Sequence, residues 1–187
     1  MKLLLHVCCA PCAVAIVDEL GQKAEIQLGG FFYNPNIHPI EEHDKRKISV
    51  EAMASAYKLP MTFYDENGLA LWKEKLGQEK IQRCTTCYAL RMDETAKLAK
   101  EKGFDAFTTS LLISPYQDHA LIKSLGERTA EKYKLQFYYE DFRPLYRRGR
   151  ELSRAKGYYM QKFCGCLYSY SESDHPKKPI YHFEDSF

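Results

Sequence analysis

The sequence lacks the features that would assign it to a membrane or secreted class. No stretch of about 18 consecutive apolar residues occurs in its 187 residues, which excludes the usual pattern of a membrane-spanning helix. The opening apolar run, 1–5, is soon interrupted by His6 and Pro11, and no small residues mark a cleavage site. Internal repeats and low-complexity linkers are also absent from the sequence. We therefore expect a soluble, cytoplasmic protein with one domain, 1–187, and no membrane partner.

A glycine-rich loop is missing after the first expected strand, where the sequence reads "CCAPC" at 8–12. Without glycine this loop cannot form the nest of backbone amides with which many α/β proteins bind phosphate. The loop offers cysteine thiols at that place instead of backbone amides. A large net charge is missing too: the formal value is +2, so only the distribution of charge can indicate a nucleic-acid partner.

The chain alternates strand-like and helix-like segments. Five short stretches rich in apolar, aromatic or β-branched residues are predicted to be strands: 2–7, 25–33, 61–64, 106–109 and 136–139. Segments of helical character lie between and after them: 11–20, 38–59, 85–102, 117–134 and 145–156. This alternation predicts a Rossmann-like α/β fold, a parallel sheet with helices on both faces. The last segment, 157–187, has little periodicity, and we expect an irregular tail.

The seven cysteines form three tight groups: Cys8, Cys9 and Cys12; Cys84 and Cys87; Cys164 and Cys166. A lone cysteine is most often a buried structural residue, but three groups with chelating spacings indicate metal or redox chemistry. A structural zinc site and a four-iron cluster each take four thiolates. Seven therefore predict two centres, divided four and three.

Two further expectations concern individual cysteines. Neighbouring side chains of an extended strand point to opposite sides, so we expect Cys8 and Cys9 to serve different centres. Gly165 tolerates unusual backbone angles and would let Cys164 and Cys166 converge. A centre with three thiolates keeps a position open for water, a carboxylate or substrate. The spacing does not choose iron over zinc.

Positive charge is concentrated in the segment 143–162, which has seven basic residues and the single acid Glu151. The basic residues are Arg143, Arg147, Arg148, Arg150, Arg154, Lys156 and Lys162. Tyr146, Tyr158 and Tyr159 are interleaved with them. Arginines that contact phosphates beside aromatic rings that stack on bases suit a single-stranded loop of nucleic acid, although a solvated helix face is the alternative.

Several motifs together resemble the epoxyqueuosine reductase QueH family. They are "HVCCAPC" at 6–12, "YNPNIHPIEEH" at 33–43, "RCTTCYALRM" at 83–92, "TTSLLISPYQDH" at 108–119 and "KFCGCLYS" at 162–169. The resemblance covers nearly the whole chain, and all seven cysteine positions fit it.

The resemblance implies a HUP-like α/β fold and an oxidoreductase of queuosine biosynthesis. The implied reaction reduces the epoxide of epoxyqueuosine, at the wobble position of a tRNA anticodon loop, to the cyclopentene of queuosine with loss of water. The family also implies a [4Fe-4S] cluster beside a second metal, iron in preference to zinc, and an unidentified electron donor. We hypothesise that the cluster passes electrons singly while the second metal acts as a Lewis acid.

A nearby acid would protonate the departing oxygen. Tyr116, Asp118 and His119 follow the fourth expected strand and are candidates, as are Tyr33 and Asp141. Helix capping is the alternative for Asp118, and ordinary surface polarity is the alternative for His119. Asp141 is also a candidate ligand of a three-thiolate metal.

Two other functions compete with this interpretation. An ATP-dependent iron–sulfur tRNA thiolase of related fold is one, and the missing glycine-rich loop argues against it. A zinc-binding interaction module is the other, and a domain of this size does not need a metal to build its core.

Overall fold

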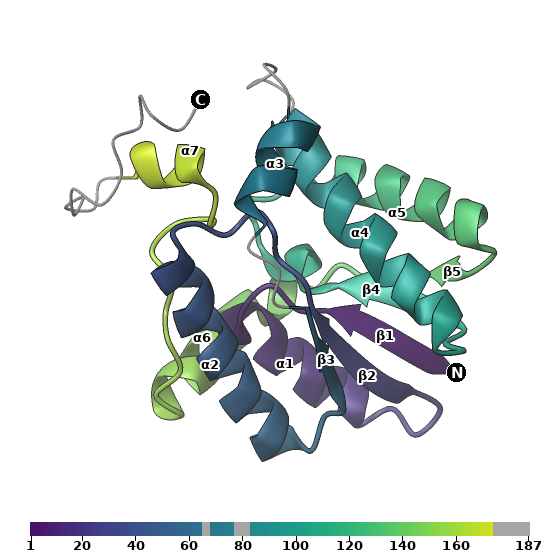
Figure 1. The fold of residues 1–187 in the computed structure, drawn as a ribbon. Helices are drawn as coiled ribbons and strands as arrows, with labels where there is room; N and C mark the ends of the chain where they lie inside the picture. Colours follow the sequence, from purple (N-terminus) through teal and green to yellow (C-terminus); the bar gives the residue numbers. More distant parts are fainter. Residues whose placement is uncertain (65–67, 77–82, 174–187) are drawn as a thin grey trace.

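The computed structural model describes residues 1–64, 68–76 and 83–173, and a parallel sheet forms its centre. The strands are β1 (Lys2–His6), β2 (Gln27–Phe32), β3 (Met61–Phe63), β4 (Ala106–Thr109) and β5 (Gln136–Phe137). They lie in the order β3-β2-β1-β4-β5, and every neighbouring pair is parallel (Figure 1). The predicted Rossmann-like α/β sheet is confirmed.

Helices cover both faces of this sheet. They are α1 (Ala10–Gly21), α2 (Ile40–Tyr57), α3 (Leu69–Leu76), α4 (Arg83–Glu101), α5 (His119–Tyr133), α6 (Tyr146–Ala155) and α7 (Leu167–Ser171). Two 3-10 turns, η2 (Ser110–Ile113) and η3 (Arg143–Leu145), complete the described elements. Figure 1 shows α1, α2 and α6 gathered on one face and α4 and α5 on the other, and the packing of α1 on α2 and α6, and of α4 on α5, agrees. None of the helices among the described residues is both long and apolar enough to cross a membrane.

The structure differs from the sequence prediction at several boundaries. The second strand begins at Gln27 rather than 25, because Ile26 still belongs to a turn in which its N–H donates to the Lys23 carbonyl. The second helix begins at Ile40 rather than 38, since Pro39 is its extended N-cap residue. The fifth strand is only Gln136–Phe137, shorter than 136–139.

Two helices were not predicted. Helix α3 places Trp72 in a small core with Cys87, Cys166 and Tyr168, so its formation depends on contacts far away in the sequence. Helix α7 lies within the expected irregular tail, 157–187, where Cys166 accepts a hydrogen bond from the Ser169 N–H at the N-cap position. The remainder of that tail, 174–187, lies outside the described residues.

The central strand carries the main core. Leu3, Leu4 and Leu5 of β1 are buried because neighbouring strands flank β1 on both sides and helices cover both faces. At its carboxyl end, the buried His6 donates from Nε2 to the Tyr33 carbonyl and accepts at Nδ1 from the Thr109 hydroxyl. Burial lowers the pKa of His6 to about 4, so the imidazole is neutral at pH 7. This network ties together the chain ends of β1, β2 and β4.

The strand order creates a switch point beside β1. Strand β2, which follows β1 in the sequence, pairs on one side of β1, and β4 pairs on the other side. The loops that follow β1 and β4 therefore lead away in opposite directions along the sheet. In open parallel sheets, ligands bind beyond the carboxyl ends of strands at such a point. The loop after β1 is the cysteine-rich segment 8–12.

Candidate metal centre and active site

Cys8, Cys9 and Cys12, the three-thiol group, converge at the junction of β1 and α1. Their sulfur atoms all lie within 4.8 Å of one another, and the Cys8 and Cys9 sulfurs are 3.7 Å apart. Cys9 is the extended N-cap residue of α1, and Cys12 lies in its first turn. The prediction that Cys8 and Cys9 point to opposite sides is wrong, because β1 ends at His6 and the chain is already turning into the helix.

Two polar side chains contact this group. Ser110 accepts a hydrogen bond from the Cys8 N–H at 3.0 Å, and its hydroxyl donates to the Cys8 sulfur at 3.4 Å. The Gln161 amide donates to the Cys9 sulfur at 3.0 Å and lies 3.6 Å from the Cys12 sulfur. Hydrogen bonds from Cys12 and Cys9 lower the pKa of Cys8, whereas burial raises the pKa of Cys9.

The other four thiols, the four-thiol group, come from two segments far apart in the sequence. Cys84 and Cys87 lie in the first turns of α4, and Cys164 and Cys166 lie in the chain just before α7. Cys87 and Cys166 share the small core around Trp72, and the charges of Cys164, Cys166 and Cys84 act on Cys87. Among the described residues, only Cys8, Cys9 and Cys12 form a group whose sulfur atoms all lie within 4.8 Å of one another. Burial raises the pKa of Cys87 to about 12. Cys84 and Cys164 are exposed, so this group reaches the surface.

A buried arginine holds the chain segment that carries Cys164. Arg46 of α2 forms an ion pair of 2.7 Å with Glu42 and donates to the carbonyls of Cys164 and Phe163, each at 2.9 Å. Gly165 has φ of +136°, a conformation that residues with a side chain rarely adopt. A Cβ there would also lie 3.1 Å from Arg46 Nη1. This bend therefore favours glycine, and the convergence of Cys164 and Cys166 on a metal stays a prediction.

A cavity of about 610 Å³ is lined by members of both groups. Cys8 and Cys12 line it from one group and Cys164 lines it from the other. Tyr116, which is 80% exposed, also lines the cavity, and its ring meets the ring of Tyr146 edge to face with centroids 6.1 Å apart. The cavity is large enough for a nucleoside-sized group beside the thiols.

The predicted proton donors lie in different places. Tyr116 lines the cavity, whereas Asp118 caps α5 by accepting from the Leu121 N–H at 3.0 Å. His119 donates from Nε2 to the Ser114 carbonyl at 3.2 Å, so its ring stabilises the loop 114–118 before α5. Neither Asp118 nor His119 is among the residues that line the cavity.

Tyr33 and Asp141 also lie away from the cavity lining. Tyr33 is buried and stacks on Phe31 with ring centroids 5.9 Å apart. Asp141 is exposed and forms hydrogen bonds of 2.8 and 2.5 Å with the Arg143 guanidinium, which lowers the pKa of the carboxyl to about 2. A carboxylate held in this way is a poor candidate for a metal ligand, and Asp141 in that role stays a prediction without support from its position.

The five predicted RNA-binding arginines differ in their partners. Arg143 pairs with Asp141, and Arg148 pairs with Asp18 and Glu19 of α1. Arg147, almost fully exposed, pairs with Glu151 at 2.9 Å. Arg150 lies over the Tyr146 ring and lines the cavity, and Arg154 is exposed. Arg147, Arg150 and Arg154 are spaced i, i+3 and i+7, so they share one face of α6.

Helix α6 is fixed firmly beside the three-thiol group. A Cβ at Gly149 would lie 2.8 Å from the Pro11 carbonyl oxygen, so only glycine permits this approach of α6 to α1. The face of α6 that carries Arg147, Arg150 and Arg154 therefore has a fixed position relative to α1, the helix that contains Cys12.

Several polar side chains beside the cysteines were not predicted from the sequence. Arg91, Ser110, Gln117 and Gln161 donate to the sulfur atoms, and the buried Arg46 donates to the Cys164 carbonyl. Arg91 follows Cys87 by four residues, a spacing that puts both on one helix face and was a readable signal. The contact between Gln161 and Cys9 joins residues 152 positions apart, which no local pattern indicates.

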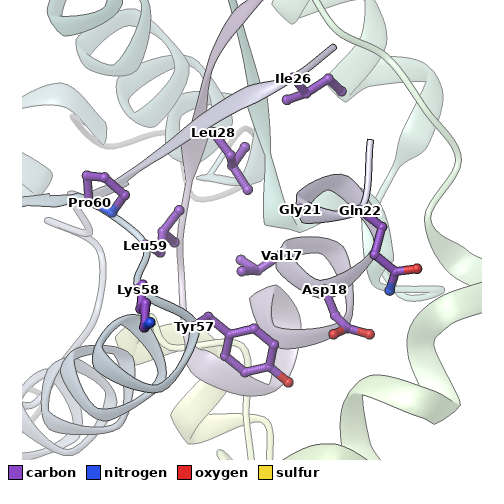
Figure 2. Close-up of a pocket in the computed structure, with 10 residues that line it drawn as sticks. All are labelled: Val17, Asp18, Gly21, Gln22, Ile26, Leu28, Tyr57, Lys58, Leu59 and Pro60. Carbon is purple, nitrogen blue, oxygen red and sulfur yellow. The ribbon is translucent and has the colours of Figure 1, made fainter. Parts of the chain in front are cut away.

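A second cavity of about 360 Å³ lies away from the thiols, between α1 and the segment that joins α2 to β3. Figure 2 shows Val17 and Asp18 of α1 facing Tyr57 and Leu59 across it. Its lining includes no thiol and no histidine. The chemistry that metals need is therefore concentrated in the first cavity.

Comparisons with known proteins identify the family to which this chain is similar. The family model described as "Epoxyqueuosine reductase QueH" matches residues 3–172. The chain is 33% identical over 178 residues to the epoxyqueuosine reductase QueH of Thermotoga maritima, with 90% of each chain covered. It is 34% identical over 180 residues to that of Haemophilus influenzae, covering 92% of this chain and 73% of the relative.

Among solved structures, the U34-tRNA thiolase NcsA from Methanococcus maripaludis with its [4Fe-4S] cluster aligns with a TM-score of 0.47 and 12% identity, covering 95% of this chain and 78% of that one. That likeness is too distant to bear on the reaction. The family match and the identities to its relatives are sufficient by themselves: this chain belongs to the QueH family of epoxyqueuosine reductases, oxidoreductases of queuosine biosynthesis.

Proposed function

We propose that this protein reduces the epoxide of epoxyqueuosine in tRNA to the cyclopentene of queuosine. The observation that carries the proposal is one cavity lined by Cys8 and Cys12 of the convergent three-thiol group and by Cys164 of the four-thiol group. Conversion of the epoxide to the alkene consumes two electrons and two protons and releases the oxygen as water. A site for this reaction needs an electron source, a group that polarises the C–O bond and an acid, all beside one cavity.

The geometry of the three-thiol group fits a mononuclear metal. A tetrahedral ion with metal–sulfur bonds of about 2.3 Å holds its sulfur ligands about 3.8 Å apart. The Cys8 and Cys9 sulfurs are 3.7 Å apart, and Cys12 is close to both. Three thiolates would leave one coordination position for water or substrate, and Cys8 and Cys12 line the cavity. We propose that this position faces substrate and that the ion is iron in preference to zinc.

The donor set of the four-thiol group fits a [4Fe-4S] cluster, which takes four cysteine thiolates. Cys84, Cys87, Cys164 and Cys166 supply that number. When bound, such a cluster supplies electrons one at a time, while the ion of the other group acts as a Lewis acid. The chain itself orients the thiols through Arg46 and Gln161, and it orders the loop after β4 through Asp118 and His119.

Tyr116 is our proposed proton donor, because it lines the cavity while Asp118 and His119 brace its loop. Tyr116→Phe removes the hydroxyl and keeps the ring, so we expect turnover to fall about 100-fold with substrate affinity unchanged. Tyr139→Phe, which changes another exposed tyrosine, is the control. Single-turnover rates and tRNA affinity measure the two effects. Full activity of Tyr116→Phe would assign the proton to another group.

We further propose that the tRNA anticodon loop lies over the exposed face of α6. Arg147, Arg150 and Arg154 share that face, and Arg150 reaches the cavity beside Tyr146. Arginines supply phosphate contacts, and an aromatic ring beside them suits an unpaired base. Arg143, Arg147 and Arg148 each pair with a carboxylate, so we expect Arg150 and Arg154 to contribute most. A protein acting on tRNA in this way would work in the cytoplasm.

The decisive experiment supplies the metals and a chemical reductant, since the natural electron donor is unidentified. Protein reconstituted with iron and sulfide under anaerobic conditions is incubated with dithionite and epoxyqueuosine-containing tRNA. The proposal predicts loss of one oxygen atom from the modified nucleoside, measured by mass spectrometry, and no reaction with Cys8→Ser protein. An unchanged nucleoside with fully loaded wild-type protein would overturn it.

A further inference from the structure

Arg91 is a buried cation on α4, one turn beyond Cys87. Its side chain is only 2% exposed. Its Nε donates to the Cys87 carbonyl at 3.0 Å, and its Nη2 donates to the Cys87 sulfur at 2.8 Å. These contacts link the guanidinium directly to one member of the four-thiol group.

The other fully buried arginine near the thiols has a conventional counter-ion. Arg46 pairs with Glu42, which is itself buried. For Arg91, no hydrogen bond or ion pair to a carboxylate is found among the described residues. The thiols whose charges act on Arg91 once they are deprotonated are Cys87, Cys164 and Cys8. A buried charge without a counter-ion is strongly unfavourable, so thiolates are the natural partners of this cation.

The position of Arg91 relates it to both thiol groups. It lines the same cavity as Cys8 of the three-thiol group and Cys164 of the four-thiol group. Its charge also acts on the neutral His6, two residues before Cys8. One guanidinium therefore lies within electrostatic reach of both proposed metal sites.

We propose that Arg91 is a positioning residue that supplies the positive counter-charge shared by the three-thiol and four-thiol groups. The inference rests on the proposed function only in that the thiols hold a redox-active centre. Reduction adds one negative charge beside the guanidinium, and the guanidinium stabilises that charge in a buried setting. Arg91 therefore raises the reduction potential of the four-thiol centre and favours its thiolate, metal-bound state.

A matched pair of variants at Arg91 separates the effect of its positive charge from the effect of its packing. Arg91→Gln removes the charge and keeps a donor amide, whereas Arg91→Lys keeps the charge and loses the planar guanidinium. Arg128→Gln, an exposed position on α5, controls for a general loss of one positive charge. The readouts are the midpoint potential of anaerobically reconstituted protein by spectroscopic titration and the iron content per chain.

We expect Arg91→Gln to shift the reduction equilibrium at least about tenfold toward the oxidised form, about 59 mV more negative for a one-electron couple. Arg91→Lys and Arg128→Gln should stay close to wild type. Failure of Arg91→Gln to bind iron while Arg91→Lys does would also support the proposal. Equal potentials in all proteins, or equal defects in the Gln and Lys variants, would overturn the charge role. Turnover of wild-type protein on tRNA is measured separately, so failure of the proposed function would be distinguished.

Discussion

The two thiol groups are built in different ways. The three-thiol group comes from five consecutive residues, 8–12, at the end of the central strand, and the first turn of α1 brings the sulfurs together. The four-thiol group joins the start of α4 to a chain segment before α7 and depends on contacts from Arg46 and on the backbone of Gly165. The fold that forms the main core therefore also forms the first group. The second group depends on a few tertiary contacts that single substitutions can remove.

The largest effects are expected from one cysteine in each group. Cys12→Ser and Cys166→Ser should each lower turnover at least about 1000-fold, because a metal at such a site supplies several kcal/mol of stabilisation. Cys12→Ser should lose the mononuclear ion and keep the cluster absorption, and Cys166→Ser should show the opposite pattern. Elemental analysis and visible spectra after reconstitution measure this. Exchange of the two patterns would reverse our division of the thiols.

The next test uses two glycines with positive φ. Gly165→Ala forces a side chain into a conformation that disfavours it by roughly 1–3 kcal/mol and brings a Cβ against Arg46. Gly157→Ala, where φ is +69° and no atom lies within 4 Å of an added Cβ, introduces strain alone. We expect Gly165→Ala to lose metal from the four-thiol group and Gly157→Ala to keep it. Equal metal content in both would mean that the bend at Gly165 does not position these cysteines.

Two glutamines allow a comparison with a smaller expected effect on metal binding, because each donates to a sulfur atom of a different group. Gln161→Leu removes the donor to Cys9, and Gln117→Leu removes the donor 3.8 Å from the Cys164 sulfur. Loss of a side chain that orients a ligand typically weakens metal affinity by about 10-fold or more. We expect Gln161→Leu to affect the three-thiol group only and Gln117→Leu the four-thiol group only. Competition with a chelator measures each affinity, and a shared defect would show that the groups form one coupled unit.

Local structure could be predicted from the sequence, whereas contacts between distant segments could not. The alternation of strands and helices and the positions of Cys84 and Cys87 at a helix start follow from local patterns, and the structure has them. The convergence of Cys8 with Cys9 was mispredicted, because β1 ends at His6, one residue earlier than expected, and both cysteines lie in the turn into α1 rather than on an extended strand. Helix α3 was missed because Trp72 packs on residues from α4 and from the chain around Cys166. Contacts of that kind are absent from any single stretch of sequence.

The smallest effect concerns the region over which we propose that tRNA lies. Arg154 is exposed on α6, on the side of the three-thiol group, whereas Arg83 lies beside the four-thiol group and makes two 2.6 Å hydrogen bonds to Glu172. Arg154→Gln should weaken tRNA binding by a few-fold and reduce the salt slope by about one unit, since it removes one phosphate contact. Arg83→Gln should leave affinity unchanged and lose only an exposed ion pair, worth about 1 kcal/mol or less. Fluorescence anisotropy at several salt concentrations measures both, and the reverse outcome would place the RNA over the four-thiol group.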